Sequence, residues 1–198
     1  MYQKQTFKQF AIPLVVAALI LVSVSTLSHY FEKPVTTETI SPALQKYSGY
    51  SFLLNGEKIS ISEGAFMTEN LQGELSPANI KYFGHDAVGD FDGDGKQDVA
   101  FIVTKKTSGS GTFYYVVSLL KIGLGKVGTE AFFIGDRIAP QTTEVKNSNI
   151  LIINYVDRKK GESFTASPSV GASLYLILDT KMLPRSTASI RTVVFSFS

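Results

Sequence analysis

The residues of this sequence best suited to chemistry are acidic side chains at a regular spacing. They are Asp90, Asp92, Asp94 and Asp98. Counted from the first as position 1, they occupy positions 1, 3, 5 and 9, and Gly95 falls at position 6. In a loop that winds around an ion, such side chains converge on it, the glycine permits the sharp bend, and the carbonyl at position 7 supplies another oxygen. Because these donors are hard oxygens, and the loop holds no His or Cys, the pattern predicts Ca²⁺. The predicted ligands are Asp90, Asp92, Asp94, Lys96 and Asp98.

The same loop also suits a tight turn, since its two Asp-Gly pairs both fit type I′ geometry. A turn requires only one such pair and leaves Asp90 and Asp98 unexplained, so calcium binding is the better interpretation. Position 12 is Phe101, where a sensor EF-hand has a bidentate glutamate. The loop is therefore similar to the calcium loops of FG-GAP repeats, which lead into a strand, and a structural role is expected. Asp86 is a candidate for a sixth oxygen.

Other short segments of the chain are distinctive. They include Gly-Ser-Gly-Thr-Phe-Tyr-Tyr and Gly-Asp-Arg-Ile-Ala-Pro-Gln-Thr-Thr-Glu, and the full set is Tyr82–Asp90, Gly109–Tyr115, Gly135–Glu144, Asn154–Arg158 and Pro168–Gly171. With the acidic loop, these blocks resemble in order one uncharacterised family of small bacterial envelope proteins, over roughly residues 48–178. The resemblance implies kinship and no activity, and residues 180–198 lie outside it.

The segment that must position the loop, residues 45–198, is predicted to be a mainly β domain. Its apolar residues fall in short runs rich in β-branched and aromatic side chains, separated by turn signals. Val99–Val103 and Phe113–Leu120 are apolar on both faces, which is typical of central strands, and Lys105–Gly111 suits the hairpin loop that joins them. The expected fold is a single antiparallel β-sandwich or open barrel preceded by one N-terminal transmembrane helix.

The longest apolar run of the chain is Phe10–Leu27, and positive charge precedes it at Lys4 and Lys8. Eighteen helical residues span about 27 Å, close to the thickness of a bilayer core. An uncleaved signal anchor is the favoured interpretation, with the N-terminus in the cytoplasm. A cleaved signal peptide and a water-soluble core helix are the alternatives. The predicted organisation is a cytoplasmic 1–9, a transmembrane 10–31, a linker 32–44 and an extracytoplasmic 45–198.

Composition narrows the classes of function. The chain of 198 residues is 44% hydrophobic and 18% charged, with a formal net charge of +2 and no cysteine. The balance of hydrophobic and charged residues argues against disorder and against general nucleic-acid binding. The absence of cysteine excludes disulfides and thiol catalysis. The expected protein is a single-pass, membrane-anchored, calcium-binding domain on the periplasmic or cell-surface side. Its expected partners are the lipid bilayer through residues 10–31 and an envelope protein or cell-wall polymer that it binds or inhibits.

The alternative is an envelope hydrolase acting on a glycan or peptide. The side chains considered for it are His85, Ser108, Ser110, Glu130, Asp136 and Glu144. A hydrolase requires two carboxylates, or a serine with His85, within hydrogen-bonding reach in one cleft. Because no Gly-x-Ser-x-Gly elbow occurs and each residue has a commoner structural role, a non-catalytic protein is expected.

Overall fold

The computed structural model describes residues 41–179 and 191–196. The predicted cytoplasmic N-terminus, transmembrane anchor and most of the linker lie outside the described residues. Within the part of the chain that is described, no helix is long and apolar enough to cross a membrane.

The first sheet follows a single turn of helix, α2 (Pro42–Gln45). Its strands are β1 (Ser51–Leu54), β2 (Glu57–Ser62), β3 (Ala65–Glu69) and β4 (Leu75–Pro77), paired antiparallel in that order. The β1–β2 turn is Asn55-Gly56, and both residues have positive φ, at 54° and 80°. This is the geometry of a two-residue hairpin, for which Asn-Gly is well suited.

The second sheet is the central one. Its strands are β5 (Ile80–Gly89), β6 (Asp98–Lys106), β7 (Thr112–Ile122) and β8 (Gly125–Gly128), paired antiparallel in that order, with β9 (Phe132–Asp136) also paired to β7. The register of β6 and β7 runs from Val99 opposite Leu119 to Lys106 opposite Thr112. The predicted hairpin between these two apolar runs is therefore present.

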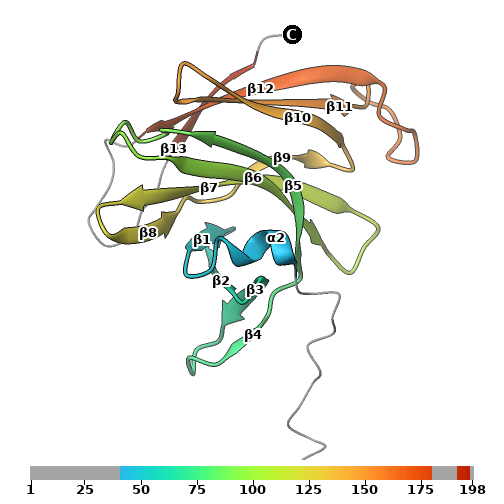
Figure 1. The fold of residues 1–198 in the computed structure, drawn as a ribbon. Helices are drawn as coiled ribbons and strands as arrows, with labels where there is room; N and C mark the ends of the chain where they lie inside the picture. Colours follow the sequence, from blue (N-terminus) through green and yellow to red (C-terminus); the bar gives the residue numbers. More distant parts are fainter. Residues whose placement is uncertain (1–40, 180–190, 197–198) are drawn as a thin grey trace, which may run out of the picture. The chain divides into compact units, whose positions relative to one another are not determined.

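The third sheet contains the remaining strands (Figure 1). They are β10 (Ala139–Lys146), β11 (Ile150–Asp157), β12 (Val170–Asp179) and β13 (Arg191–Ser196), paired antiparallel in that order. The prediction of a mainly β, antiparallel fold is confirmed.

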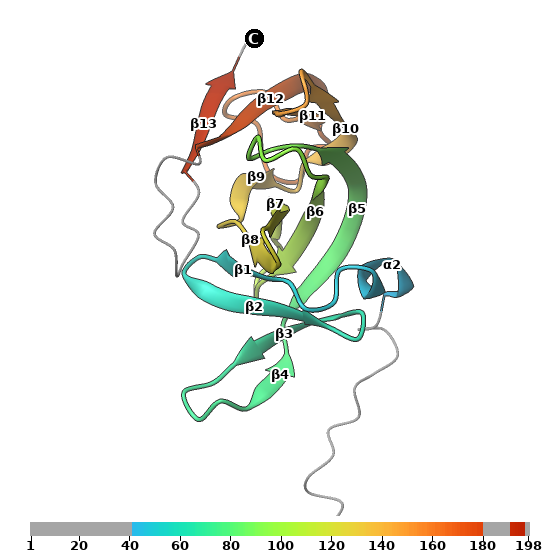
Figure 2. The ribbon, with the colours of Figure 1, turned by 60° about the vertical axis from the view of Figure 1, so that its left-hand side comes forward.

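The central sheet lies between the other two, and each of its faces contributes to a separate core (Figures 1 and 2). Phe101 and Val103 pack with Phe52 of the first sheet, whereas Ile102 packs with Ile153 of the third. Strands covered on both faces need apolar residues at every position, which is why β6 and β7 read as continuous apolar runs. The structure thus has three sheets and two cores, where a single sandwich or open barrel was expected.

Candidate metal centre

The acidic loop connects β5 to β6 and is fixed at both of its ends. Gly89 pairs with Asp98 in the strand register, so the loop closes a hairpin. A side chain at Gly89 is excluded, because a Cβ there would lie 2.6 Å from the carbonyl oxygen of Ser148. The next amide, that of Asp90, donates a 2.9 Å hydrogen bond to the same carbonyl. The start of the loop is therefore held against the turn between β10 and β11.

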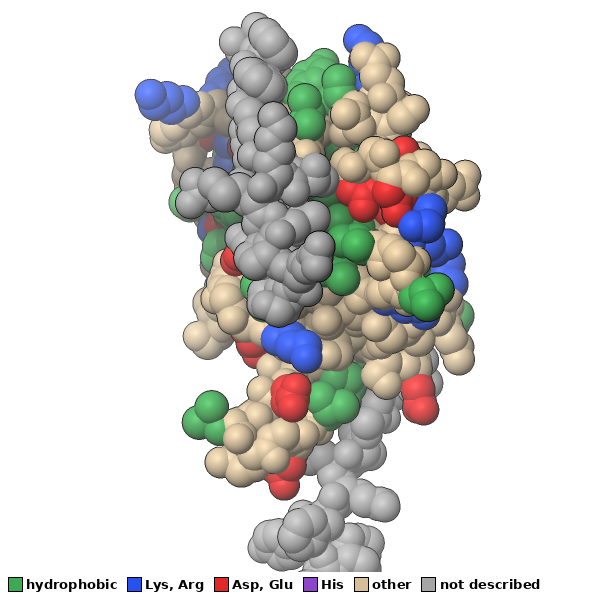
Figure 3. Space-filling view, turned by 90° about the vertical axis from the view of Figure 1, so that its left-hand side faces the viewer, with side chains coloured by type: hydrophobic (Ala, Val, Ile, Leu, Met, Phe, Trp, Pro, Cys, Tyr) green, Lys and Arg blue, Asp and Glu red, His purple; other side chains and the backbone are tan. Residues whose placement is uncertain are grey.

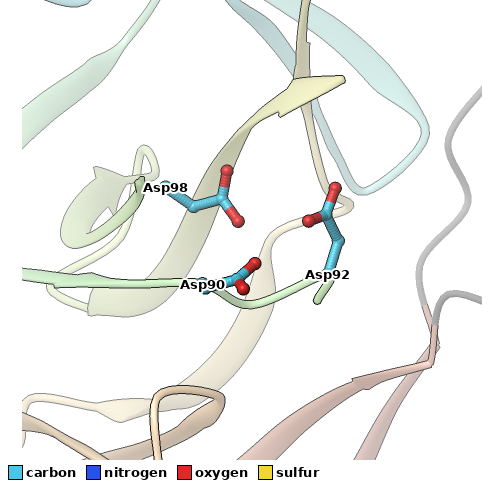
Figure 4. Close-up of side chains that lie close together, drawn as sticks. All are labelled: Asp90, Asp92 and Asp98. Carbon is cyan, nitrogen blue, oxygen red and sulfur yellow. The ribbon is translucent and has the colours of Figure 1, made fainter. Parts of the chain in front are cut away.

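Three of the predicted ligands come together in space. A carboxylate oxygen from each of Asp90, Asp92 and Asp98 lies within 4.8 Å of the other two. Figure 4 shows the three carboxylates turned toward one another, from the loop and from the first residue of β6. Asp98 is buried, at 2% exposure, and the other two are partly exposed. A cluster of three carboxylate oxygens at this spacing is compatible with a divalent cation of the calcium type.

The curvature of the loop depends on its backbone amides and on two glycines. The carboxylate of Asp90 accepts hydrogen bonds from the amides of Gly93 at 2.9 Å and Gly95 at 3.0 Å. Both glycines have positive φ, at 78° and 81°, a conformation that side chains disfavour. The glycine at position 6 therefore permits the bend for which its spacing was singled out.

Asp94 lies outside this cluster. Its Oδ1 accepts the backbone amide of Lys96 at 2.9 Å, and its Oδ2 forms a 2.6 Å ion pair with the Lys96 ammonium. The hydrogen bond from Lys96 lowers the pKa of Asp94. The fourth carboxylate of the predicted ligand set is thus held by a lysine two residues later. The Lys96 ammonium also donates a longer hydrogen bond, of 3.5 Å, to the carbonyl of Lys121.

Asp98 is tied to two separate parts of the backbone. Its Oδ2 accepts the amide of Phe91 at 2.9 Å, and its Oδ1 accepts the amide of Lys121, in β7, at 3.0 Å. Burial raises the pKa of Asp98, although these two hydrogen bonds oppose the shift. Burial also raises the pKa of Asp92, and the charges of its acidic neighbours add to the effect. A bound cation would favour the ionised forms that burial and crowding penalise.

Asp86 belongs to a different cluster. Its carboxylate accepts hydrogen bonds from the phenols of Tyr47, at 2.5 Å, and Tyr82, and from the ammonium of Lys46, at 2.9 Å. Burial disfavours the charge on Asp86, but these three donors outweigh it and lower its pKa. The side chain therefore ties the α2 region to β5 and is not one of the three converging carboxylates.

The side chains considered for hydrolysis have other contacts. The ring of His85 stacks on Phe83, with centroids 5.3 Å apart, and no hydrogen bond within residues 41–179 joins it to Ser108 or Ser110. Asp136 pairs with Arg137 at 2.7 Å, as expected for a surface salt bridge. Glu144 accepts hydrogen bonds from Thr142, in the same strand, and from Asn154, in the neighbouring strand.

Sequence reasoning did not find the partners that come from distant parts of the chain. Lys121 lies 23 residues from Asp98, and Tyr47 lies 39 residues from Asp86. Neither lysine nor tyrosine stands in a motif, so no local signal indicated these contacts.

Comparison with known proteins finds no significant match for this chain. It matches no protein-family model, and no curated protein or solved structure is significantly similar to it. The resemblance to an uncharacterised envelope family stays a prediction.

Proposed function

We propose that this protein is a calcium-binding, non-catalytic β domain on the outer side of the cell membrane, anchored by residues 10–31, that binds or inhibits another envelope component. The observation that carries the proposal is the convergence of Asp90, Asp92 and Asp98 around one point. Because both ends of the loop are held in place, an ion bound within it would stabilise the β5–β6 hairpin. Calcium is commonly millimolar outside cells, where even a weak site is filled.

The anchor and the partner rest on sequence. The apolar run Phe10–Leu27 supports a membrane anchor. The structural contacts of His85, Asp136 and Glu144 support a binding role over a catalytic one. No observation favours the hydrolase over this reading, so no second function is proposed.

Thermal unfolding of the full chain in a mild detergent tests calcium binding. Millimolar Ca²⁺ should raise the melting temperature relative to EGTA, because an ion that binds only the folded state stabilises it by mass action. Mg²⁺ should raise it less, since Mg²⁺ demands octahedral geometry and dehydrates reluctantly. Asp92→Asn should remove most of the calcium response, whereas Glu130→Gln, at an exposed carboxylate outside the loop, should retain it. An equal melting temperature in Ca²⁺ and EGTA would refute the calcium site.

A further inference from the structure

The turn between β7 and β8 presents a leucine to solvent. Ile122 pairs with Gly125 at the end of the ladder, so Gly123 and Leu124 form the tip of the hairpin. Leu124 is 107% exposed relative to its reference state. A single exposed leucine is ordinary on a protein surface, so its neighbours decide whether it has a role.

Those neighbours are basic. Lys121 and Lys126 lie on either side of the tip and are opposite each other in the strand register. Both are exposed, and among the described residues the Lys121 ammonium has no partner. The Lys126 ammonium lies farther back, where it donates a 2.9 Å hydrogen bond to the carbonyl of Ser48. A tip with an apolar side chain at its end and ammonium groups behind it is complementary to a bilayer surface with anionic headgroups.

The same end of the central sheet carries the acidic loop. The amide of Lys121 donates to Asp98, and the carbonyl of Lys121 lies 3.5 Å from the ammonium of Lys96. Figure 3 views the domain from the side on which β7 joins β8 in Figure 1, and there acidic and basic side chains lie next to one another. The charge of this end therefore depends on whether a cation occupies the loop.

A second hairpin tip provides a contrast within the same domain. Leu71, between β3 and β4, is also fully exposed, at 100%. Its nearest charged residues along the chain are Glu69 and Glu74, and both are exposed. The two tips share an exposed leucine and differ in the sign of the charge that flanks it.

We propose that the β7–β8 tip contacts the anionic lipid bilayer to which the chain is anchored, and that Ca²⁺ in the acidic loop permits this contact. The proposal rests on the calcium site and the anchor proposed above. Without the ion, the four aspartates of the loop outnumber the ammonium groups of Lys96, Lys121 and Lys126, and an anionic surface repels this end. A divalent ion reverses the sign of the local charge, so that Lys121 and Leu124 can approach the headgroups.

The proposed anchor, residues 10–31, allows so small a contact to contribute to membrane binding. A lysine near an anionic membrane strengthens binding by only about fivefold. On a free protein, such a contact would be weak. When the chain is held at the membrane, the tip is present at a high effective concentration, and a weak second contact becomes populated.

An environment-sensitive fluorophore tests the contact, and the absence of native cysteine makes labelling specific. Leu124→Cys and, as a matched control, Leu71→Cys are labelled with NBD in the full chain. Each is reconstituted into nanodiscs of phosphatidylglycerol with phosphatidylcholine, or of phosphatidylcholine alone. With Ca²⁺ and phosphatidylglycerol, the label at position 124 should shift to shorter wavelength and lose its quenching by iodide. The label at position 71 should not change, and Lys121→Glu should abolish the change at position 124.

The outcomes separate the two proposals. Melting of the same labelled samples with Ca²⁺ and EGTA reports the calcium site independently. Stabilisation by Ca²⁺ without a spectral change at position 124 overturns the lipid contact and leaves the calcium site standing. An equal change at both tips, or a change at position 124 that persists in EGTA, also overturns the proposal. Absence of calcium stabilisation refutes the site on which the proposal rests.

Discussion

The buried carboxylate of Asp98 accepts the backbone amide of Lys121 at 3.0 Å and thereby joins the acidic loop to β7. The other oxygen of the same carboxylate accepts the amide of Phe91. Asp98 thus has a structural role in the hairpin that is separate from any role toward a cation. Asp92 accepts only a local amide of the loop, so the two aspartates should respond differently to the same substitution.

Asp98→Asn should destabilise the protein in the presence and in the absence of calcium. An amide group accepts through one atom only, so one of the two backbone amides, of Phe91 or of Lys121, loses its acceptor, at a cost of about 1–3 kcal/mol. For a chain of this length, the melting temperature should fall by about 3–10 °C in EGTA. Asp92→Asn is the control, because it should lower stability only where calcium is present. Equal melting temperatures of Asp98→Asn and the wild type in EGTA would contradict the structural role.

Asp86→Asn should weaken the link between the α2 region and β5. It should also make the free energy of unfolding depend less on pH in the acid range. The pKa of Asp86 is lowered below its ordinary 3.8, so its stabilisation is present above that pH and is lost as the pH falls through the folded-state value. Loss of charge-assisted hydrogen bonds should cost about 2 kcal/mol at neutral pH. Urea unfolding between neutral and acid pH measures both effects. Lys46→Met is a matched control with a smaller expected effect, because the Lys46 ammonium is exposed.

Tyr47→Phe should change stability on the alkaline side. Burial, and then the hydrogen bond to Asp86, raise the pKa of Tyr47 from 10.0 to about 12. A raised pKa means that its stabilisation is complete below pH 10 and is lost as the pH rises toward 12. Phenylalanine keeps the ring that stacks on Phe101 but has no phenol to ionise. The variant should therefore lose less stability than the wild type between these pH values; an identical decline in urea titrations would exclude this role for Tyr47.

Gly128→Ala should disrupt the contact between β8 and β1. A Cβ at Gly128 would lie 2.5 Å from the carbonyl oxygen of Ser51 and 2.6 Å from the Cβ of Phe52, so the two strands must separate. Overpacking of this kind costs about 1–3 kcal/mol. Gly109→Ala is the matched control, because its nearest atom would be Thr107 Oγ1 at 3.8 Å, an ordinary contact. Comparable unfolding midpoints for the two variants would show that β1 and β8 adjust more easily than their packing indicates.

Much of the fold could be predicted from local patterns, and its layering could not. Runs that are apolar on both faces, such as Val99–Val103, predicted central strands because only a doubly covered strand buries every side chain. The sheet that covers each face is set by contacts between distant segments, and local sequence patterns do not indicate these contacts. The three-sheet arrangement with two cores therefore appeared only in the structure.

The candidate site could likewise be predicted only in part. The spacing predicted that the four aspartates of the loop converge, since a loop that bends at Gly95 brings alternate side chains to its inner side, and Asp90, Asp92 and Asp98 do so. Position alone could not show that Asp94 pairs with Lys96, because that outcome depends on the directions of two flexible side chains.

The sequence by itself determined the strand-rich character of the domain, the place of the acidic loop and the bend that curves it, because these follow from residue type and spacing within about ten residues. Only the tertiary structure decided the burial of Asp98, its bond to Lys121 and the proximity of the loop to the β7–β8 tip. The physical reason is that burial and hydrogen-bond partnership are properties of an environment assembled from distant segments. The same residue types at the same spacing would have different partners in another arrangement of sheets.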